Sequence, residues 1–220
     1  MPLFSIIIPL YNCEKLIKTC LLSVLNQNFN NYEIIIINDC SKDRGLKICK
    51  KYEKKYPEIK IINQKTNKGV SSSRNLGIKS SNGEYIIFLD SDDRLENFSL
   101  YKLSKFIENN KKADTIVVSH NANSDGKIFN KKITKINNND AKIKFINEIP
   151  YFIGYCWRFV TKRRFLKSNK IFFMDDARQF EDEEFVCKLL FFSKSIVFFN
   201  KKYYFKELQD RASLASTTNF

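Results

Sequence analysis

Three carboxylates stand within four positions at the end of the segment EYIIFLDSDD, Glu84–Asp93. Asp90, Asp92 and Asp93 follow directly on an apolar run, although like charges this close repel one another. If the chain stays extended, Asp90 and Asp92 point to the same side, because side chains alternate along a strand. Two such carboxylates suit a hard divalent cation, Mn²⁺ or Mg²⁺, whose remaining ligands a substrate phosphate can supply. We therefore predict a metal site at Asp90 and Asp92. The alternative is a solvated turn whose acids cap a helix, which is a sufficient explanation for Asp93.

Two further acidic positions are candidates for chemistry. Asp39 ends the apolar run Tyr32–Asp39, where its carboxylate suits either the imide N–H of a uracil ring or a turn before the next helix. The run Glu181–Glu184 starts a predicted helix, and one of its acids is a candidate general base. For Glu183 and Glu184 we favour solvated acids that complement the helix dipole.

An anion site is predicted in NKGVSSSRNLG, Asn67–Gly77. Gly69 stands at a predicted helix start with small residues after it, so backbone N–H groups and Arg74 would face an anionic group. The segment matches neither the Walker A pattern nor the dinucleotide fingerprint. The single histidine, His120, leaves little basis for a catalytic Ser–His or Cys–His pair.

The first 120 residues alternate apolar runs with segments of helical periodicity, which predicts βαβ units and a mainly parallel sheet. The predicted strands are Leu3–Pro9, Tyr32–Asp39, Ile59–Asn63, Glu84–Asp90 and Asp114–His120. The predicted helices are Cys13–Gln27, Asp43–Tyr56, Gly69–Ser81 and Leu95–Asn110. Ligands bind at the carboxyl ends of the strands in such sheets, so Pro9–Asn12, Asn38–Ser41, Asn63–Asn67 and Asp90–Asp93 are expected to converge.

The second half of the chain is less regular. We expect an exposed hairpin or loop over Gly126–Asn139 and a short helix over Asp140–Ile149. The segment Tyr155–Leu166 is predicted to pair with the sheet and then turn helical. A helix over Glu181–Ser193 and a strand over Ser195–Lys206 follow.

Composition favours a globular protein with a basic surface. The formal net charge is +14 and the hydrophobic fraction is 43%, enough for a core. The six cysteines show no CxxC pair, which favours reduced thiols in a cytosolic protein. No apolar run approaches the ~20 residues of a membrane span, and we find no signal-peptide pattern. A basic protein that binds RNA or an anionic membrane surface stays an alternative.

The order of the motifs resembles that of the inverting, GT-A-fold family 2 glycosyltransferases of bacteria. The resemblance runs through FSIIIPLYN, YEIIIINDCSKD, NKGVSSSRNLGIKSSNGEYIIFLDSDD, FEDEEF and KKYYFKELQDRAS, and it is densest over residues 3–95. Asn38 and Cys40 depart from the Asp and Gly that the family usually has beside Asp39. These departures keep open a third reading, a glycosyltransferase-like protein that has lost activity.

The resemblance implies a single α/β domain with the GT-A fold, a Rossmann-like α/β/α sandwich with a mainly parallel central sheet and a C-terminal acceptor-side extension. Residues 1–120 would bind the nucleotide-sugar, and residues 121–220 would carry the acceptor side and the catalytic base. Asp182, the second residue of the E-D element, would be that base. The implied donor-binding residues are Pro9, Tyr11, Asn12, Asp39, Gly69, Arg74, Asp90 and Ser91, and the implied metal ligands are Asp92, the more direct one, and Asp90.

The implied activity is transfer of a sugar, with inversion, from a UDP-linked donor to a hydroxyl of a saccharide or lipid-linked saccharide. Such a step belongs to the synthesis of bacterial surface polysaccharide, lipooligosaccharide or other glycans. The implied cofactor is Mn²⁺ or Mg²⁺, and no nucleic-acid partner is expected. The implied location is the cytoplasm, and the basic aromatic segment Lys201–Lys206 suggests peripheral contact with the inner face of the cytoplasmic membrane.

Overall fold

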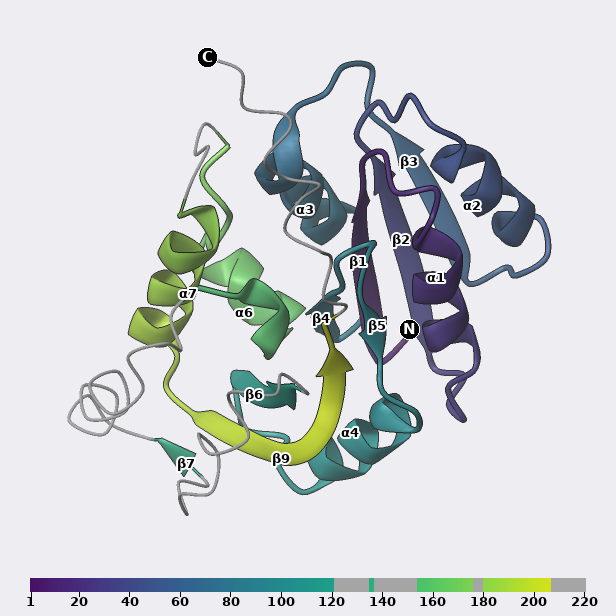
Figure 1. The fold of residues 1–220 in the computed structure, drawn as a ribbon. Helices are drawn as coiled ribbons and strands as arrows, with labels where there is room; N and C mark the ends of the chain where they lie inside the picture. The colour runs from purple at the N-terminus through teal and green to yellow at the C-terminus, as the bar shows by residue number, and fades with distance from the viewer. Residues whose placement is uncertain (121–134, 137–153, 176–179, 207–220) are drawn as a thin grey trace.

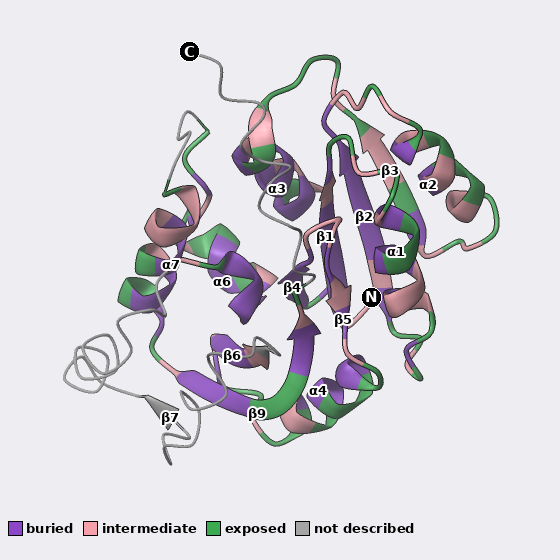
Figure 2. Ribbon diagram, viewed as in Figure 1, coloured by how far each residue is buried: buried purple, intermediate pink, exposed green. Residues whose placement is uncertain are grey.

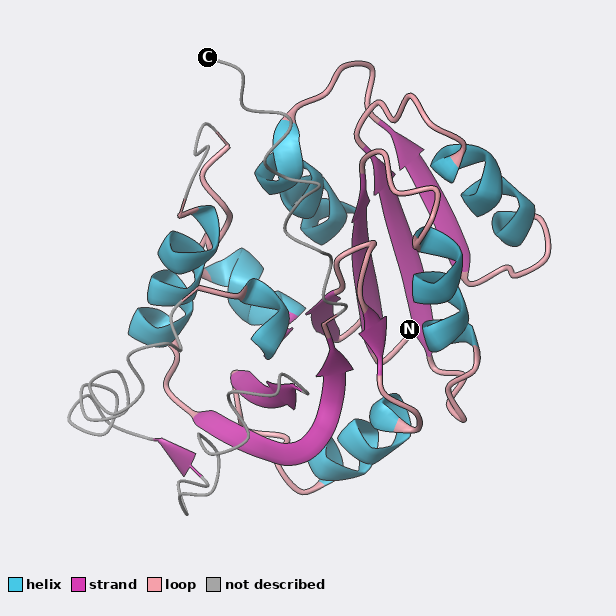
Figure 3. Ribbon diagram, in the orientation of Figure 1, coloured by secondary structure: helices cyan, strands magenta, loops and turns pink. Residues whose placement is uncertain are grey.

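A computed structural model describes residues 1–120, 135–136, 154–175 and 180–206. Within them a nine-stranded mixed sheet has the order β3-β2-β1-β4-β8-β6-β9-β5, with β7 paired to β9. The sheet curls, and helices lie on both of its faces (Figures 1 and 3). The α/β class predicted from the sequence is thus confirmed.

The N-terminal half is a parallel sheet, as its uniformly apolar strands predict. Its strands are β1 (Phe4–Leu10), β2 (Tyr32–Asn38), β3 (Ile59–Asn63) and β4 (Tyr85–Phe88). Helices α1 (Ile17–Leu25) and α2 (Gly45–Glu53) cover one face, and α3 (Gly69–Ser80) covers the other (Figure 1). These crossovers place the carboxyl ends of β1, β2 and β4 along one edge.

The C-terminal half adds short antiparallel pairings to the mainly parallel sheet. Strand β8 (Phe159–Lys162) is antiparallel to both β4 and β6 (Thr115–His120). Strand β9 (Ile196–Phe205) runs parallel to β6 and antiparallel to β5 (Arg94–Leu95) and β7 (Lys135–Ile136). The remaining helices are α4 (Ser99–Glu108), the 3-10 helix η1 (Cys156–Arg158), α6 (Arg163–Ser168) and α7 (Glu181–Phe192).

Two predicted helices begin four residues later than the sequence indicated. Helix α1 starts at Ile17, because the residues before it form a turn, and a two-residue strand, β5, replaces the start of the predicted helix Leu95–Asn110. Local periodicity gives no sign of β5, since its partner is β9, far along the chain. The predicted helix Asp140–Ile149 and most of the predicted loop Gly126–Asn139 lie outside the described residues.

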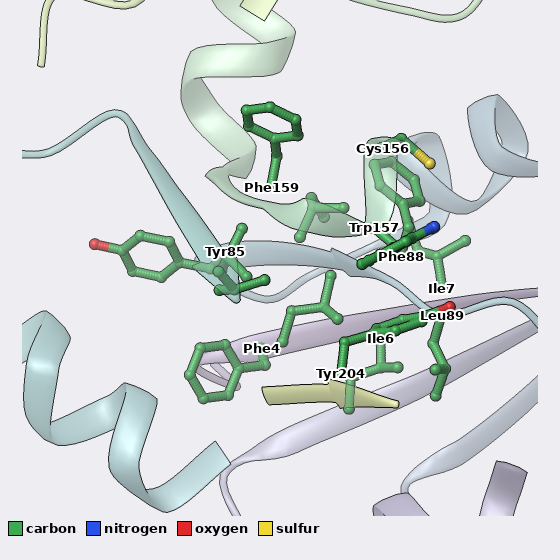
Figure 4. Packing of buried hydrophobic residues seen from close by; sticks show 14 of the residues in the cluster. Phe4, Ile6, Ile7, Tyr85, Phe88, Leu89, Cys156, Trp157, Phe159 and Tyr204 are labelled. Carbon is green, nitrogen blue, oxygen red and sulfur yellow. The ribbon is translucent and has the colours of Figure 1, made fainter. Parts of the chain in front are cut away.

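The core lies on both faces of β1, β2 and β4 and continues to β9 (Figures 2 and 4). Helix α3 packs tightly on β1: a Cβ at Gly77 would lie 2.3 Å from Ile7 Cγ2. Since no side chain fits there, Gly77 lets α3 approach the sheet closely. This approach sets the position of Arg74, one turn earlier on the same helix.

None of the six cysteines, all of which lie in the described part, forms a disulfide. Over that same part of the chain, every helix is too short or too polar to cross a bilayer.

Candidate active site

A cavity of about 590 Å³ opens at the carboxyl ends of β1, β2 and β4. It is lined by Pro9, Leu10, Tyr11, Asp39, Asn67, Gly69, Val70, Ser73, Arg74, Asp90, Ser91 and Asp92. Of the nine donor-site and metal-site residues that the resemblance implied, the structure brings all but Asn12 to this cavity. The edge of the sheet at which ligands were expected is therefore hollow.

Asn12 fastens two turns together beside the cavity. Its side-chain oxygen accepts the backbone N–H of Lys42 (2.8 Å), and its own N–H donates to Ser41 Oγ (3.3 Å). Asn12 also has a φ of 47°, in the left-handed region that asparagine tolerates better than most residues. It thus ties the end of β1 to the end of β2.

Asp39 caps helix α3, from which α2 and β3 separate it along the chain. Its buried carboxylate accepts the backbone N–H groups of Lys68 (2.7 Å) and Gly69 (2.8 Å) and the side-chain amide of Gln64 (2.9 Å). The helix that directly follows Asp39 in the chain is α2. It is capped by Asp43, which accepts the N–H of Gly45 (2.9 Å). Three donors fix the orientation of the Asp39 carboxylate at the wall of the cavity.

The two departures from the family pattern have local partners. The Asn38 amide group donates to Asn63 Oδ1 (3.0 Å), a bond that an ionised Asp would not donate. Cys40 has a φ of 61°, where glycine is free of the steric cost of about 1 kcal/mol that other residues incur. The turn after β2 therefore keeps a glycine-like conformation although its residue is cysteine.

Arg74 connects the end of β4 with the start of α7. Its guanidinium, only 5% exposed, contacts Asp90 Oδ1 at 3.0 Å and Asp182 Oδ1 at 2.6 Å, and Glu181 Oε1 lies 3.9 Å away. Its Cζ also lies 5.3 Å from the centre of the Phe173 ring. The sequence predicted an external anion for Arg74, and the structure gives it carboxylates of its own chain. The guanidinium of Arg74 thereby joins Asp90 and Asp182, two acids to which the sequence analysis had given different roles.

Asp182 is a largely buried carboxylate at this junction. Its side chain is 13% exposed, and Oδ2 accepts the backbone N–H of Cys156 (3.3 Å). Burial raises the pKa of Asp182, the guanidinium of Arg74 offsets part of the rise, and the charge of Asp90 adds to it. A carboxylate with a raised pKa, held by two donors, has the character of a general base.

The neighbouring acids of α7 have other contacts. Glu184 forms an ion pair with Lys188 one turn along the helix, and Glu183 lies beside Gly154. Both side chains are partly buried, so Glu183 and Glu184 are less solvated than the sequence predicted.

Asp90 and Asp92 offer carboxylate oxygens on the wall of the cavity. Burial raises the pKa of Asp92, and the like charge of Asp90 raises it further. The described residues contain no group of three His, Cys, Asp or Glu side chains that would hold a metal by themselves. Two repelling carboxylates with hard oxygen donors fit a divalent cation that shares its coordination with a phosphate.

The model of the glycosyl transferase family 2 matches residues 5–184, most of the chain. The chain belongs to glycosyl transferase family 2. The match begins in β1 and ends in the first turn of α7, so it includes every residue of the cavity and Asp182.

The family 2 chain is similar to a Bacillus subtilis glycosyltransferase, EpsJ, with 34% identity over 192 residues, 84% of this chain and 55% of the relative. It is also similar to the poly(ribitol-phosphate) beta-glucosyltransferase of Bacillus spizizenii, with 35% identity over 87% of this chain and 30% of the relative. The crystal structure of Staphylococcus aureus TarS 1–349 in complex with UDP-GlcNAc is 28% identical and has a TM-score of 0.80, over 97% of this chain and 61% of that one. The chain spans about half the length, or less, of these curated relatives.

Sequence reasoning missed Val70 and Ser73 on the wall of the cavity. Ser73 lies one turn after Gly69, and its hydroxyl donates to the Gly69 carbonyl (3.1 Å). The i, i+4 spacing of Gly69 and Ser73 was a usable signal, because such positions share one face of a helix.

Proposed function

We propose that the protein is an inverting glycosyltransferase that uses a nucleotide-sugar donor and whose catalytic base is Asp182. The observation that carries this proposal is the bridge formed by Arg74, which contacts Asp90 at the wall of the cavity and Asp182 beside it. A donor bound in the cavity would have its reacting end near the base. Membership of family 2 supports the same activity.

The donor is proposed to be UDP-linked. Pro9, Tyr11 and Asp39 would frame the uracil ring of the donor. A carboxylate oxygen of Asp39 retains a lone pair that can accept the imide N–H of that ring. The gap between this end and Asp90–Asp92 would take the ribose and the diphosphate. The likeness to a TarS structure solved with UDP-GlcNAc supports uracil over other nucleobases.

Asp90 and Asp92 would hold Mn²⁺ or Mg²⁺, with Asp92 the more direct ligand. When bound, the cation would neutralise charge on the diphosphate. Asp182 would take the proton of an acceptor hydroxyl while that oxygen bonds to the anomeric carbon and the bond to the diphosphate breaks. A single displacement from the opposite face inverts the anomeric centre. Arg74 would keep the Asp182 carboxylate oriented for this transfer.

The acceptor is proposed to be a saccharide or lipid-linked saccharide of a bacterial surface polymer. The relatives whose names state an acceptor act on poly(ribitol phosphate), which supports a surface polymer in general.

The test is Asp182→Asn, which keeps the size of the side chain and removes its basicity. We expect turnover of the sugar donor to fall at least ~100-fold, the usual contribution of a general base. Affinity for UDP, measured by calorimetry, should stay within about twofold, since Asp182 does not line the cavity. Glu183→Gln, the same chemical change one residue along α7, is the control and should keep its turnover. Retained turnover in Asp182→Asn would transfer the base role to another acid.

We also propose that the enzyme is cytoplasmic and that it contacts an anionic bilayer through α2 rather than through Lys201–Lys206. The segment Lys201–Lys206 suggested this contact, yet Tyr203 and Tyr204 are fully buried. A basic groove of about 360 Å³ lies elsewhere, lined by Glu14, Lys15, Arg44, Lys47, Ile48 and Lys51. The exposed lysines beside the partly buried Ile48 suit an anionic surface.

Sedimentation with anionic vesicles at low salt tests the membrane contact. Lys47→Glu/Lys51→Glu should abolish binding, and Lys201→Glu/Lys202→Glu, with the same charge change, should leave most of it. If the two double variants lose binding equally, net charge rather than the α2 groove is responsible.

A further inference from the structure

Tyr204 lies under the turn that carries the acidic residues of the cavity. Its hydroxyl donates to Asp93 Oδ2 (2.7 Å) and accepts the backbone N–H of Asp90 (3.3 Å). The same turn is closed by a hydrogen bond from the N–H of Asp93 to the carbonyl of Asp90 (3.1 Å). One buried hydroxyl thus holds the first and last residues of a four-residue turn whose third residue is Asp92.

The ring of Tyr204 also contacts the helix η1, which supports Asp182, the proposed catalytic base. Trp157 stacks on it with ring centres 4.2 Å apart and planes 14° apart (Figure 4). Trp157 follows Cys156, whose backbone N–H donates to Asp182. The side chain therefore contacts both the acidic turn and the short helix η1 that supports Asp182.

Strand β9 brings Tyr204 to this place because it is long and bends around the sheet (Figure 1). It pairs with β6 from Ile196 to Tyr204, with register shifts after Phe199. On its other edge Tyr204 pairs with Leu95 of β5, directly after the acidic turn. The two-residue strand β5 thus has a use: it anchors β9 against the turn.

The neighbouring Tyr203 shows that burial alone does not explain these bonds. It is equally buried, on the same strand, and its hydroxyl has no hydrogen-bond partner among the described residues. A phenylalanine would fill either position. What distinguishes Tyr204 is that its hydroxyl meets the two ends of the turn.

We propose that Tyr204 is a positioning residue that orders the turn Asp90–Asp93 and so presents Asp92 to the donor cavity. The consequence for donor binding rests on the proposed function. The ordering of the turn itself does not, so the two can be tested separately.

The experiment compares Tyr204→Phe with Tyr203→Phe in the full chain. Both keep the ring, so both should fold, and only the first loses hydrogen bonds. Amide hydrogen exchange over Asp90–Asp93, without ligand, should become about 10-fold faster in Tyr204→Phe and stay unchanged in Tyr203→Phe. Calorimetric titration with UDP and Mn²⁺ should show a Kd about 10-fold weaker in Tyr204→Phe alone.

Equal exchange in the two variants would overturn the proposal. Faster exchange with an unchanged Kd would overturn its link to donor binding. If the wild-type protein does not bind UDP with Mn²⁺, the proposed function fails, and the exchange measurement still decides whether Tyr204 orders the turn.

Discussion

At the scale of single residues, the site depends on how the positive charge of Arg74 compensates the negative charges of several acids. Arg74 is nearly buried, and its two terminal nitrogens contact Asp90 and Asp182, with Glu181 nearby. Removing a charge from such a buried pair leaves its partners uncompensated, which costs more than an exposed ion pair contributes. Arg74 therefore controls the protonation of Asp182 as well as its position.

Arg74→Gln should change the pH dependence of the reaction. Asp182 must be ionised to accept a proton, so activity falls as the pH drops through its raised pKa. The positive charge of Arg74 lowers that pKa, and removing the charge raises it further. We expect the acid limb of the kcat/KM profile to move to higher pH. Lys79→Gln, on the exposed face of the same helix, is the control and should leave the limb in place.

An acid limb at the same pH, or a lower one, in Arg74→Gln would show that another group is the base. The sequence predicted Asp90 and Asp92 from their place at a strand end, and the resemblance to family 2 implied Asp182 among the four acids at a helix start. It did not predict that Arg74 joins them, because the Arg74–Asp182 contact depends on α3 and α7 meeting in space.

At the scale of elements, α3 is positioned by contacts with the sheet at two points. Gly77 allows its close approach to β1, and Asp39 accepts the N–H groups at its start. An acid at a helix N-terminus satisfies N–H groups that otherwise lack partners. Asp39 thus serves α3 and the wall of the donor cavity at once.

Asp39→Ala should lower both stability and donor affinity. Loss of the cap should lower the free energy of unfolding by about 1–2 kcal/mol. UDP affinity should fall about 10-fold, as expected for losing a hydrogen bond to a charged group. Asp43→Ala removes the corresponding cap of α2 and is the matched control, with a similar loss of stability and unchanged UDP affinity.

Urea unfolding and calorimetry on both variants measure these quantities. Equal UDP affinity in Asp39→Ala and Asp43→Ala would restrict Asp39 to the capping of α3.

Local signals identified β1 to β4 and α3, whose apolar runs and glycines are clear in the sequence. Strand β5 and the role of β9 escaped, because each depends on a partner distant in sequence.

At the scale of the whole molecule, the two halves of the chain share one site. The first 120 residues supply the cavity, and the C-terminal half supplies Asp182 and Tyr204, which reach it through Arg74 and the acidic turn. The two halves of the chain thus meet at these side chains. Their separate donor and acceptor roles stay a prediction.

The most direct test of a donor site in this cavity is a thermal-shift measurement with UDP-, GDP-, CMP- and dTDP-linked sugars, each with and without Mn²⁺. At 100 times the Kd a ligand stabilises by about 2.7 kcal/mol, which for a chain of this size raises Tm by about 5 °C or more. We predict such a rise with UDP-linked sugar only when Mn²⁺ is present, and its loss in Asp92→Ala. No shift with any nucleotide, or the same shift in Asp92→Ala, would contradict the account.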